Sequence, residues 1–408
     1  MADETPESLL TRPAELEALA AEIRHAGRFA FDTEFVSEET FEPVLCLVQV
    51  ATRDRLALVD ALAIGDLTPF WDAVTDPAVE VVMHAAGEDL RIGRLQTGRL
   101  PRRVVDVQIA AGLVGFGYPL SLGNLVGQTL GIAVTGGETR TDWRRRPLSP
   151  GQVRYALDDV RHLLPIADLL SERLARQDRA AWAEAEFADF LAQIERRADE
   201  DRWRRLPGLH QLNRRGLEIA RRLVEWRQED ARHANRPLRQ VLRDDLLVAI
   251  ARRQPASRRD LEALRDFNRP ALLGKAGEIL AVIAAAQRVP AEALPEPAER
   301  RDEGPGLSMV VSLLAASLTQ CCAQHQVAPG LVGTTGDLKD LIRWHAEGQP
   351  ADRRPALLGG WREAVCGRTL LDVLTGRRAL RVVDPLADVP VALEPSDGRD
   401  ESAGADDV

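Results

Sequence analysis

The spacing of hydrophobic residues changes character near residue 170 of the chain. A helical period over 11–27 leads into three apolar runs, RFAFDTEF, VLCLVQVAT and RLALVDA, each of which predicts a strand. Helical stretches (TPFWDAVTD, EDLRIGRLQ) then alternate with the strand-like VEVVMHA and with VVDVQIAAGLVG, a strand that passes into a helix. Such alternation predicts a mixed α/β domain over residues 1–175.

From about residue 172 to 375 a helical period dominates, with few β-branched runs. Two Pro- and Gly-containing breaks, around 205–212 and 289–306, divide this part. We therefore expect two all-helical domains, at 205–288 and 305–380. Residues 385–408 are acidic and poor in apolar side chains, which predicts a disordered tail.

Composition indicates a soluble globular protein. The 408 residues exceed what one hydrophobic core usually serves, and 45% of them are hydrophobic against 28% charged. No apolar run approaches the ~20 residues of a membrane span, and the N-terminus lacks the pattern of a signal peptide. We expect a cytoplasmic protein without a membrane partner. The four cysteines form no CxxC pair, which favours buried free thiols over a zinc site.

The net charge of -10 is unevenly distributed. Residues 201–260 contain sixteen arginines against eight acidic residues, whereas residues 384–408 contain eight acidic residues against Arg399 alone. The basic segment is either a surface for the RNA or DNA backbone or a solvated helix face with internal ion pairs. The one-signed excess favours backbone binding.

Two acidic side chains stand on the first of the apolar strands. Asp32 and Glu34 are two residues apart in FAFDTEF, so the period of a strand places both on one face. Paired carboxylates on an apolar strand repel each other and are costly to desolvate, and a metal cation would offset that cost. The alternative is a strand end that carries two solvated acids.

Two further segments supply candidate ligands. Asp89 follows the strand VEVVMHA, and carboxyl ends of parallel strands commonly gather at one site. Tyr155 and Asp159 are four residues apart in RYALDDVRHLLPI, which places them on one face of a helix.

Four carboxylates and a tyrosine suit phosphodiester hydrolysis. Two hard cations, Mg²⁺ or Mn²⁺, bound by oxygen ligands about 3.5–4 Å apart, can stabilise both the attacking and the leaving oxygen. A tyrosine, whose hydroxyl ionises near pH ~10 in water, would orient the attacking water rather than deprotonate it.

In their order and spacing, these residues resemble the DEDD exonuclease superfamily, tyrosine subtype. The motifs are DTEF with Asp32 and Glu34, HAAGEDL with Asp89, and YALDDV with Tyr155 and Asp159. The stretches CLVQVAT, VVDVQIAAGLVGFG, SLGNLV and TRTDWRRRPLSPGQVRYALDDV make the chain similar to the ribonuclease D family in particular. The helical part resembles two HRDC domains, the first from LNRRGLEIARRLVEW to RRDLEAL and the second, more divergent, from LLAASLTQCC to TLLDVLTG.

The resemblance implies a fold and an activity. The fold would be a ribonuclease-H-like exonuclease core, a mixed sheet flanked by helices, followed by two helical HRDC-type domains. The activity would be the stepwise removal of 5′-mononucleotides from RNA 3′ ends with two divalent cations, acting on tRNA precursors with 3′ extensions. Relatives of this kind suggest a monomer.

Four more residues are candidates for contacts with the RNA substrate. Trp143 lies in the loop GGETRTDWRRRP together with Arg140, and it either stacks on a base or is buried. Phe35, Gln49 and His84 lie near the expected pocket, and each has a structural alternative as a packed side chain.

Two other functions use the same fold. A 3′→5′ DNA exonuclease shares the metal chemistry, and a non-catalytic RNA-binding protein would keep the fold without the reaction. The complete set of four acids and the tyrosine argues against the latter. A purely helical scaffold would leave those acids unexplained.

Overall fold

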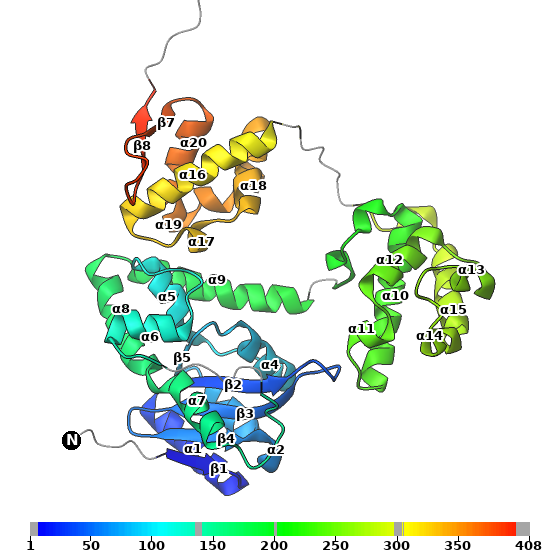
Figure 1. Ribbon diagram of the computed structural model, residues 1–408, viewed down its shortest axis with the longest axis horizontal. Helices are drawn as coiled ribbons and strands as arrows, with labels where there is room; N and C mark the ends of the chain where they lie inside the picture. The colour runs from blue at the N-terminus through cyan, green and yellow to red at the C-terminus, as the bar shows by residue number, and fades with distance from the viewer. Residues whose placement is uncertain (1–6, 135–140, 200–201, 298–303, 305, 397–408) are drawn as a thin grey trace, which may run out of the picture.

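The computed structural model describes residues 7–134, 141–199, 202–297, 304 and 306–396. Its N-terminal part is built on a six-stranded mixed sheet in the order β1-β4-β3-β2-β5-β6 (Figure 1). The strands are β1 (Glu7–Leu10), β2 (Arg28–Val36), β3 (Val44–Ala51), β4 (Leu56–Asp60), β5 (Glu80–Met83) and β6 (Arg103–Asp106). Strand β3 is antiparallel to both of its neighbours, β2 and β4. The other neighbouring pairs, β1 with β4, β2 with β5 and β5 with β6, are parallel.

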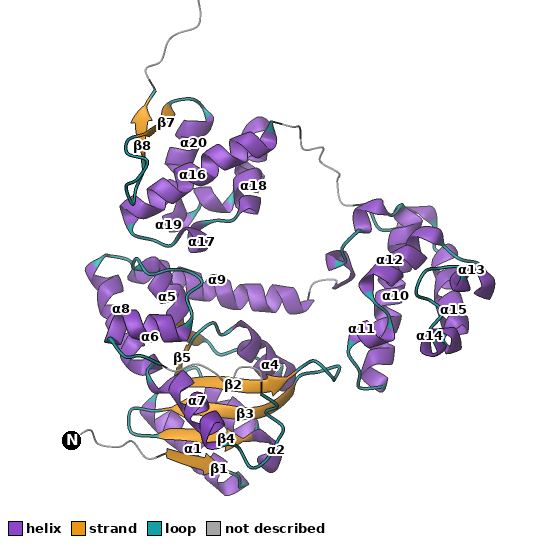
Figure 2. Cartoon of the chain, viewed as in Figure 1, coloured by secondary structure: helices purple, strands orange, loops and turns teal. Residues whose placement is uncertain are grey.

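Helices cover both faces of this sheet (Figure 2). They are α1 (Pro13–Ala26), α2 (Ala61–Ile64), α3 (Thr68–Val74), α4 (Gly87–Thr97), α5 (Val107–Leu113), α6 (Leu122–Leu130), α7 (Pro150–Arg161), α8 (Leu163–Arg176) and α9 (Ala180–Asp199). On one face, Phe29 and Phe31 of β2 pack against Phe70 of α3. The opposite face packs against α5, α7 and α8. Burial alternates only from Phe31 to Glu34 on β2, as the period of two predicts, because Phe29 and Ala30 before them are both buried.

A first helical domain follows α9 and has its own core. Its helices are α10 (Arg214–His233), α11 (Leu238–Val241), α12 (Asp244–Arg253), α13 (Arg258–Glu262), α14 (Pro270–Gly274) and α15 (Ala276–Gln287), after short 3₁₀ turns at Arg202–Arg205 and Leu209–Gln211. Phe267 is fully buried at the centre, and α10 packs along α15 and α12.

A second helical domain completes the described chain. Its helices are α16 (Leu307–His325), α17 (Pro329–Val332), α18 (Thr335–Ala346), α19 (Gly360–Arg362) and α20 (Arg368–Leu374), with a π-helical turn at Glu363–Gly367. By length and composition α16 is apolar enough to cross a membrane. Its side chains Leu314 and Leu318 are instead buried in the domain core, and the buried Ser317 and Gln320 interrupt its apolar face.

The expected disorder from residue 385 onward is wrong for its first part. Strands β7 (Arg378–Val382) and β8 (Val391–Pro395) form an antiparallel hairpin beside α16 and α20. Arg381 pairs with Glu394 across the hairpin, with its Nη2 2.6 Å from Oε1, so acidic residues there have partners that composition does not reveal. The remainder of the predicted tail, 397–408, lies outside the described residues.

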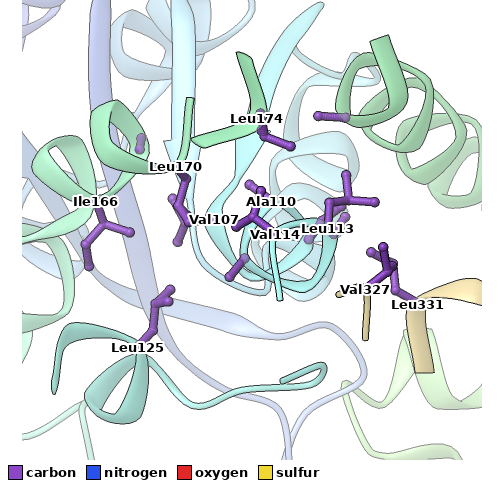
Figure 3. Close-up of a cluster of buried hydrophobic side chains, with 14 of the residues drawn as sticks. Val107, Ala110, Leu113, Val114, Leu125, Ile166, Leu170, Leu174, Val327 and Leu331 are labelled. Carbon is purple, nitrogen blue, oxygen red and sulfur yellow. The ribbon is translucent and has the colours of Figure 1, made fainter. Parts of the chain in front are cut away.

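The second helical domain shares its hydrophobic core with the sheet domain. Val327 and Leu331 lie beside Leu113, the last residue of α5, and Val114, which follows it (Figure 3), and all four belong to one continuous buried cluster. The backbone N–H of Ala328 donates to the carbonyl oxygen of Gly112 at 2.8 Å. The described cysteines, Cys46, Cys321, Cys322 and Cys366, are all buried and free, as predicted.

Candidate active site

The first pair of candidate carboxylates lies near the end of the central strand β2. Asp32 and Glu34 are each partly exposed, whereas the side chains between and before them, Thr33 and Phe31, are buried. The register with β3 shifts between Glu34 and Phe35, an irregularity that bends a strand and re-aims its side chains. Strand periodicity therefore places both acids on the face that α7 covers.

The third carboxylate follows the neighbouring parallel strand, β5. Asp89 lies in the first turn of α4, which begins a few residues after β5. Because β2 and β5 run parallel, their carboxyl ends meet at one edge of the sheet. Asp89 is 7% exposed, and its Oδ1 accepts a hydrogen bond from the hydroxyl of Thr33, which ties the two elements together.

The fourth carboxylate is supplied by α7, which lies across β2, β3 and β4. Tyr155 and Asp159 are one turn apart on this helix, and Tyr155 lies near enough to the Asp159 carboxylate to lower its pKa. Ser149 and Gln152 form a capping box that fixes the start of the helix.

The four carboxylates act on one another electrostatically. Burial, followed by repulsion from Asp89, Asp159 and Glu34, raises the pKa of Asp32 well above its usual range. Burial and repulsion from Asp159 and Asp89 raise the pKa of Glu34 to about 8.

The other two acids are raised in the same direction. Burial raises the pKa of Asp89 to about 6, against the hydrogen bond from Thr33, which lowers it. Burial and the neighbouring Asp158 raise the pKa of Asp159 to about 7, against the hydrogen bond from Tyr155. No arginine or lysine in the described chain is among the groups that shift these four pKa values.

This uncompensated negative charge fits divalent cations. Hard cations such as Mg²⁺ and Mn²⁺ prefer carboxylate oxygens, and four such groups face one another at the edge of the sheet. Within the described residues, no three His, Cys, Asp or Glu side chains already surround one point as a preformed ligand set. The argument that these residues suit divalent cations therefore rests on their oxygen donors and on the mutual repulsion of their carboxylates.

The four tentative substrate contacts lie in different environments. Gln49, paired with Asp32 across β2 and β3, is fully buried, and neither its amide nitrogen nor its amide oxygen has a hydrogen-bond partner. Trp143 is 2% exposed, and its ring centroid lies 6.1 Å from that of Tyr155. Both side chains are closed off from solvent in this structure.

Phe35 and His84 are both half-buried. Phe35 packs against the core between the sheet and α3. His84 Nε2 lies 2.8 Å from the carbonyl oxygen of Leu120. Each keeps part of its surface available beside the site.

The loop before α7 is fastened to the sheet by an ion pair that the sequence reading did not identify. Asp60, 3% exposed, accepts two hydrogen bonds from the guanidinium of Arg146, at 2.5 and 2.7 Å. Arg146 also donates to the carbonyl oxygen of Trp143 at 2.7 Å. An acid at a strand end and an Arg-rich loop were visible signals, but their pairing across 86 residues was not. Arg140 lies outside the described residues.

The arginine-rich segment is less available than its net charge suggests. Arg221 and Arg222 both pair with the buried Glu218, and Arg227 pairs with Asp244. The alternative to backbone binding was a helix face with internal ion pairs. The net charge of the segment could not exclude it, and these three arginines form such pairs.

Three family models match the chain in order. Residues 8–175 match a family described as 3′-5′ exonuclease, residues 216–283 match the HRDC domain, and residues 305–370 match the ribonuclease D C-terminal HRDC domain. With the acids at the edge of the mixed sheet, these matches define a 3′-5′ exonuclease that carries two HRDC domains.

Relatives along nearly the whole chain narrow this class. Ribonuclease D of Gluconacetobacter diazotrophicus is 38% identical over 378 residues, covering 92% of this chain and 94% of the relative. Ribonuclease D of Escherichia coli K12 is 30% identical over 370 residues, covering 90% and 98%. The crystal structure of E. coli RNase D, described as an exoribonuclease involved in structured RNA processing, matches with a TM-score of 0.77 at 29% identity, covering 91% of this chain and 99% of that one. The chain therefore belongs to the ribonuclease D family.

Proposed function

We propose that this 3′→5′ exoribonuclease releases 5′-mononucleotides from RNA 3′ ends, and that tRNA precursors with 3′ extensions are its substrates. The observation that carries the proposal is the convergence of Asp32, Glu34, Asp89 and Asp159, each with a raised pKa, beside Tyr155. The E. coli relative, an exoribonuclease involved in structured RNA processing, supports the substrate class.

The same four carboxylates would hold two divalent cations, Mg²⁺ or Mn²⁺. Bound there, such cations stabilise negative charge on the phosphate oxygens and make water a better nucleophile. Tyr155 lies near enough to Asp159 to lower its pKa, and the ring centroid of the buried Trp143 lies 6.1 Å from that of the Tyr155 ring. We assign Tyr155 the task of orienting the attacking water, and Trp143 the task of holding the tyrosine ring.

A cleft between α4 and the first helical domain is the proposed surface for an RNA backbone. It has a volume of about 500 Å³, adjoins Gly87 and Glu88 next to Asp89, and continues to the first helical domain. Three arginines from both domains line it and could meet phosphates: Arg91, Arg94 and Arg205. Arg227 also lines it but is 5% exposed and paired with Asp244. Phosphate contacts of this kind release counterions, so RNA affinity should fall steeply with added salt. If the affinity for RNA does not change with salt concentration, this surface is excluded as the RNA-binding site. Phe35 and His84 are proposed contacts for the terminal nucleotides.

The chain is proposed to act in the cytoplasm as a monomer. The four buried free thiols suit a reducing compartment. Size-exclusion chromatography with light scattering would test the oligomeric state, and a stable dimer would contradict it.

The decisive experiment uses the full chain with a 3′-extended tRNA and Mg²⁺ or Mn²⁺. Stepwise shortening from the 3′ end is expected, with loss of shortening in EDTA and in Asp32→Asn. Tyr155→Phe should slow the reaction less than Asp32→Asn does. Asp54→Asn, an exposed aspartate in the turn between β3 and β4, is the matched control and should keep full activity.

The same assay separates the alternatives. Equal or faster shortening of a DNA strand of the same sequence would make the chain a DNA exonuclease. RNA binding without shortening in either metal would make it a binding protein.

A further inference from the structure

The turn that leads from β5 into α4 has an unusual backbone. Ala85 has φ 55°, in the left-handed region that alanine rarely adopts and that glycine tolerates. Such a conformation persists only where the surrounding structure holds it. Because Ala86 is the N-cap of α4, this turn sets where the helix begins and where Asp89, in its first turn, is carried.

One buried carboxylate holds this turn. Asp106 is 1% exposed, and its two oxygens accept hydrogen bonds from the backbone N–H of Ala85 at 3.1 Å and of Ala86 at 3.0 Å. It also accepts from the N–H of Gln108 at 2.9 Å, which makes it the N-cap of α5. Met83 and Asp106 are partners in the parallel pairing of β5 and β6, so the sheet itself delivers the carboxylate to the turn.

Hydrogen bonds from neighbouring side chains also hold the turn and Asp89 in place. His84 Nε2 lies 2.8 Å from the carbonyl oxygen of Leu120, to which the amide of Gln108 also donates at 3.0 Å. At the other end, the hydroxyl of Thr33 on β2 donates to Asp89. Asp89 is thus held between β2, through Thr33, and β6, through Asp106 and the turn.

We propose that Asp106 is a positioning residue for the nuclease reaction. By binding the two consecutive amides of Ala85 and Ala86, it sets the start of α4 so that Asp89 faces Asp32. It makes no contact with the reacting atoms. This inference rests on the proposed role of Asp89 as a cation ligand.

The variant Asp106→Asn tests the carboxylate with almost no change in volume. An asparagine offers one acceptor oxygen, so one of the two turn amides loses its partner and faces an NH₂ group instead. The expected result in the full chain is a fall in kcat of about 10- to 100-fold, with the KM for a 3′-extended RNA within about twofold of wild type. The dissociation constant for Mn²⁺, measured by calorimetry without RNA, should rise by a similar factor.

Two further variants separate positioning from a general loss of structure. In an Asp89→Asn background, Asp106→Asn should weaken Mn²⁺ binding no further, because the ligand it positions is already gone. Ala85→Gly should restore part of the kcat and of the Mn²⁺ affinity of Asp106→Asn, because glycine adopts the left-handed turn without help. Asn213→Ala removes the N-cap of α10, far from the acids, and should change neither quantity.

The outcomes are distinct. Unchanged kcat and Mn²⁺ affinity in Asp106→Asn, or an equal further loss of Mn²⁺ affinity in the Asp89→Asn background, would overturn the proposal. If Asp106→Asn fails to fold, the restored folding and Mn²⁺ affinity of the Ala85→Gly double variant support it, and a double variant that folds without that affinity overturns it. The Mn²⁺ titration reads the position of Asp89 even if wild-type protein does not shorten RNA, so it stands apart from the test of the proposed function.

Discussion

The two helical domains belong to related families, yet they are joined to the nuclease domain in different ways. The second continues its hydrophobic core, with Val327 and Leu331 packed beside α5 (Figure 3). Buried polar contacts reinforce this junction: Glu186 of α9 accepts from the guanidinium of Arg362 and, at 2.8 Å, from the indole N–H of Trp361. The second helical domain and the nuclease domain therefore share one buried interior.

The first helical domain meets the nuclease domain at its surface. The amide N–H of Phe41, in the loop between β2 and β3, donates to the side-chain oxygen of Asn235 at 3.3 Å. The guanidinium of Arg232 lies 5.3 Å from the ring centroid of Phe41, and Phe41 packs against the edge of this domain's own buried core. A shift of this domain would therefore uncover Phe41, which lies in the loop after the strand that carries Asp32 and Glu34.

The largest expected difference is in independent folding. A fragment of residues 202–296 should unfold cooperatively on its own, because its core is complete. A fragment of residues 306–396 should lack a cooperative transition and bind a hydrophobic dye, because its face toward α5 would be uncovered. Circular dichroism melts of both fragments test this, and a cooperative melt of the second fragment would remove the distinction.

The next effect is on the polar part of the fused junction. Glu186→Ala should lower the free energy of unfolding by about 3 kcal/mol, because it leaves Arg362 and the Trp361 indole without their buried partner. Urea unfolding of the full chain measures this. Glu184→Ala, exposed on the same helix, should change it by less than about 0.5 kcal/mol. Equal effects of the two substitutions would mean that the junction does not depend on this pair.

The nuclease domain, which shares its core with the second helical domain, and the separate first helical domain should also differ in how their stability depends on pH. In metal-free protein, the raised pKa values of Asp89, Asp159 and Glu34, about 6, 7 and 8, mean that the folded state holds protons more tightly than the unfolded state. Their contribution is fully present below the unfolded pKa of about 4 and is lost as the pH rises through 6 to 8. Unfolding of the full chain in EDTA should show this loss, and Glu34→Gln should reduce it. Stability that increases from pH 6 to 8 would contradict it.

The first helical domain should respond with the opposite sign. Burial alone would raise the pKa of Glu218, but hydrogen bonds from Arg221 and Arg222 outweigh it and lower the value. The hydrogen bond from Arg243 lowers the pKa of Asp245. Stability from these acids is present above their unfolded pKa of about 4 and is lost as the pH falls below it. Melts of the 202–296 fragment from pH 7 to 3 measure it, and a fragment that is stabilised by acid would be inconsistent with these ion pairs.

The smallest effect concerns the surface contact itself. Asn235 has φ 43°, so Asn235→Gly keeps the backbone conformation while removing the amide that binds Phe41. The free energy of unfolding should change by less than about 1 kcal/mol, whereas small-angle scattering should show a wider range of domain separations. Arg236→Ala, exposed beside it, should leave the scattering unchanged. Unaltered scattering in Asn235→Gly would show that other contacts hold the domain.

Much of the fold was readable from local pattern. The five strands predicted from apolar runs are β2 to β6, and the alternation with helices gave the mixed α/β class. Strand β1 was not predicted, because ESLL acquires its strand character only by pairing with β4 nearly fifty residues away. The hairpin of β7 and β8 was missed for a similar reason, since an acidic composition conceals the cross-strand partner of Glu394.

In the candidate site, too, local pattern predicted some features and contacts between distant elements decided the others. Period two placed Asp32 and Glu34 on one face of β2, and a spacing of four placed Tyr155 and Asp159 on one face of α7. The order of the acidic motifs along the chain then joined them into one set. Neither the closed environment of Gln49 and Trp143 nor the bond from Thr33 to Asp89 could be read in this way. Each depends on what a distant element places on top of the residue.

The sequence by itself determined the elements, the order of the acidic motifs and the family, because periodicity and residue chemistry are local properties. Tertiary structure alone decided that Asp106 holds the turn before Asp89, that Arg146 anchors the loop before α7, and that one helical domain shares the nuclease core while the other does not. Those outcomes depend on which backbone amide or apolar face meets a side chain across the fold, and such pairings leave no periodic trace in the chain.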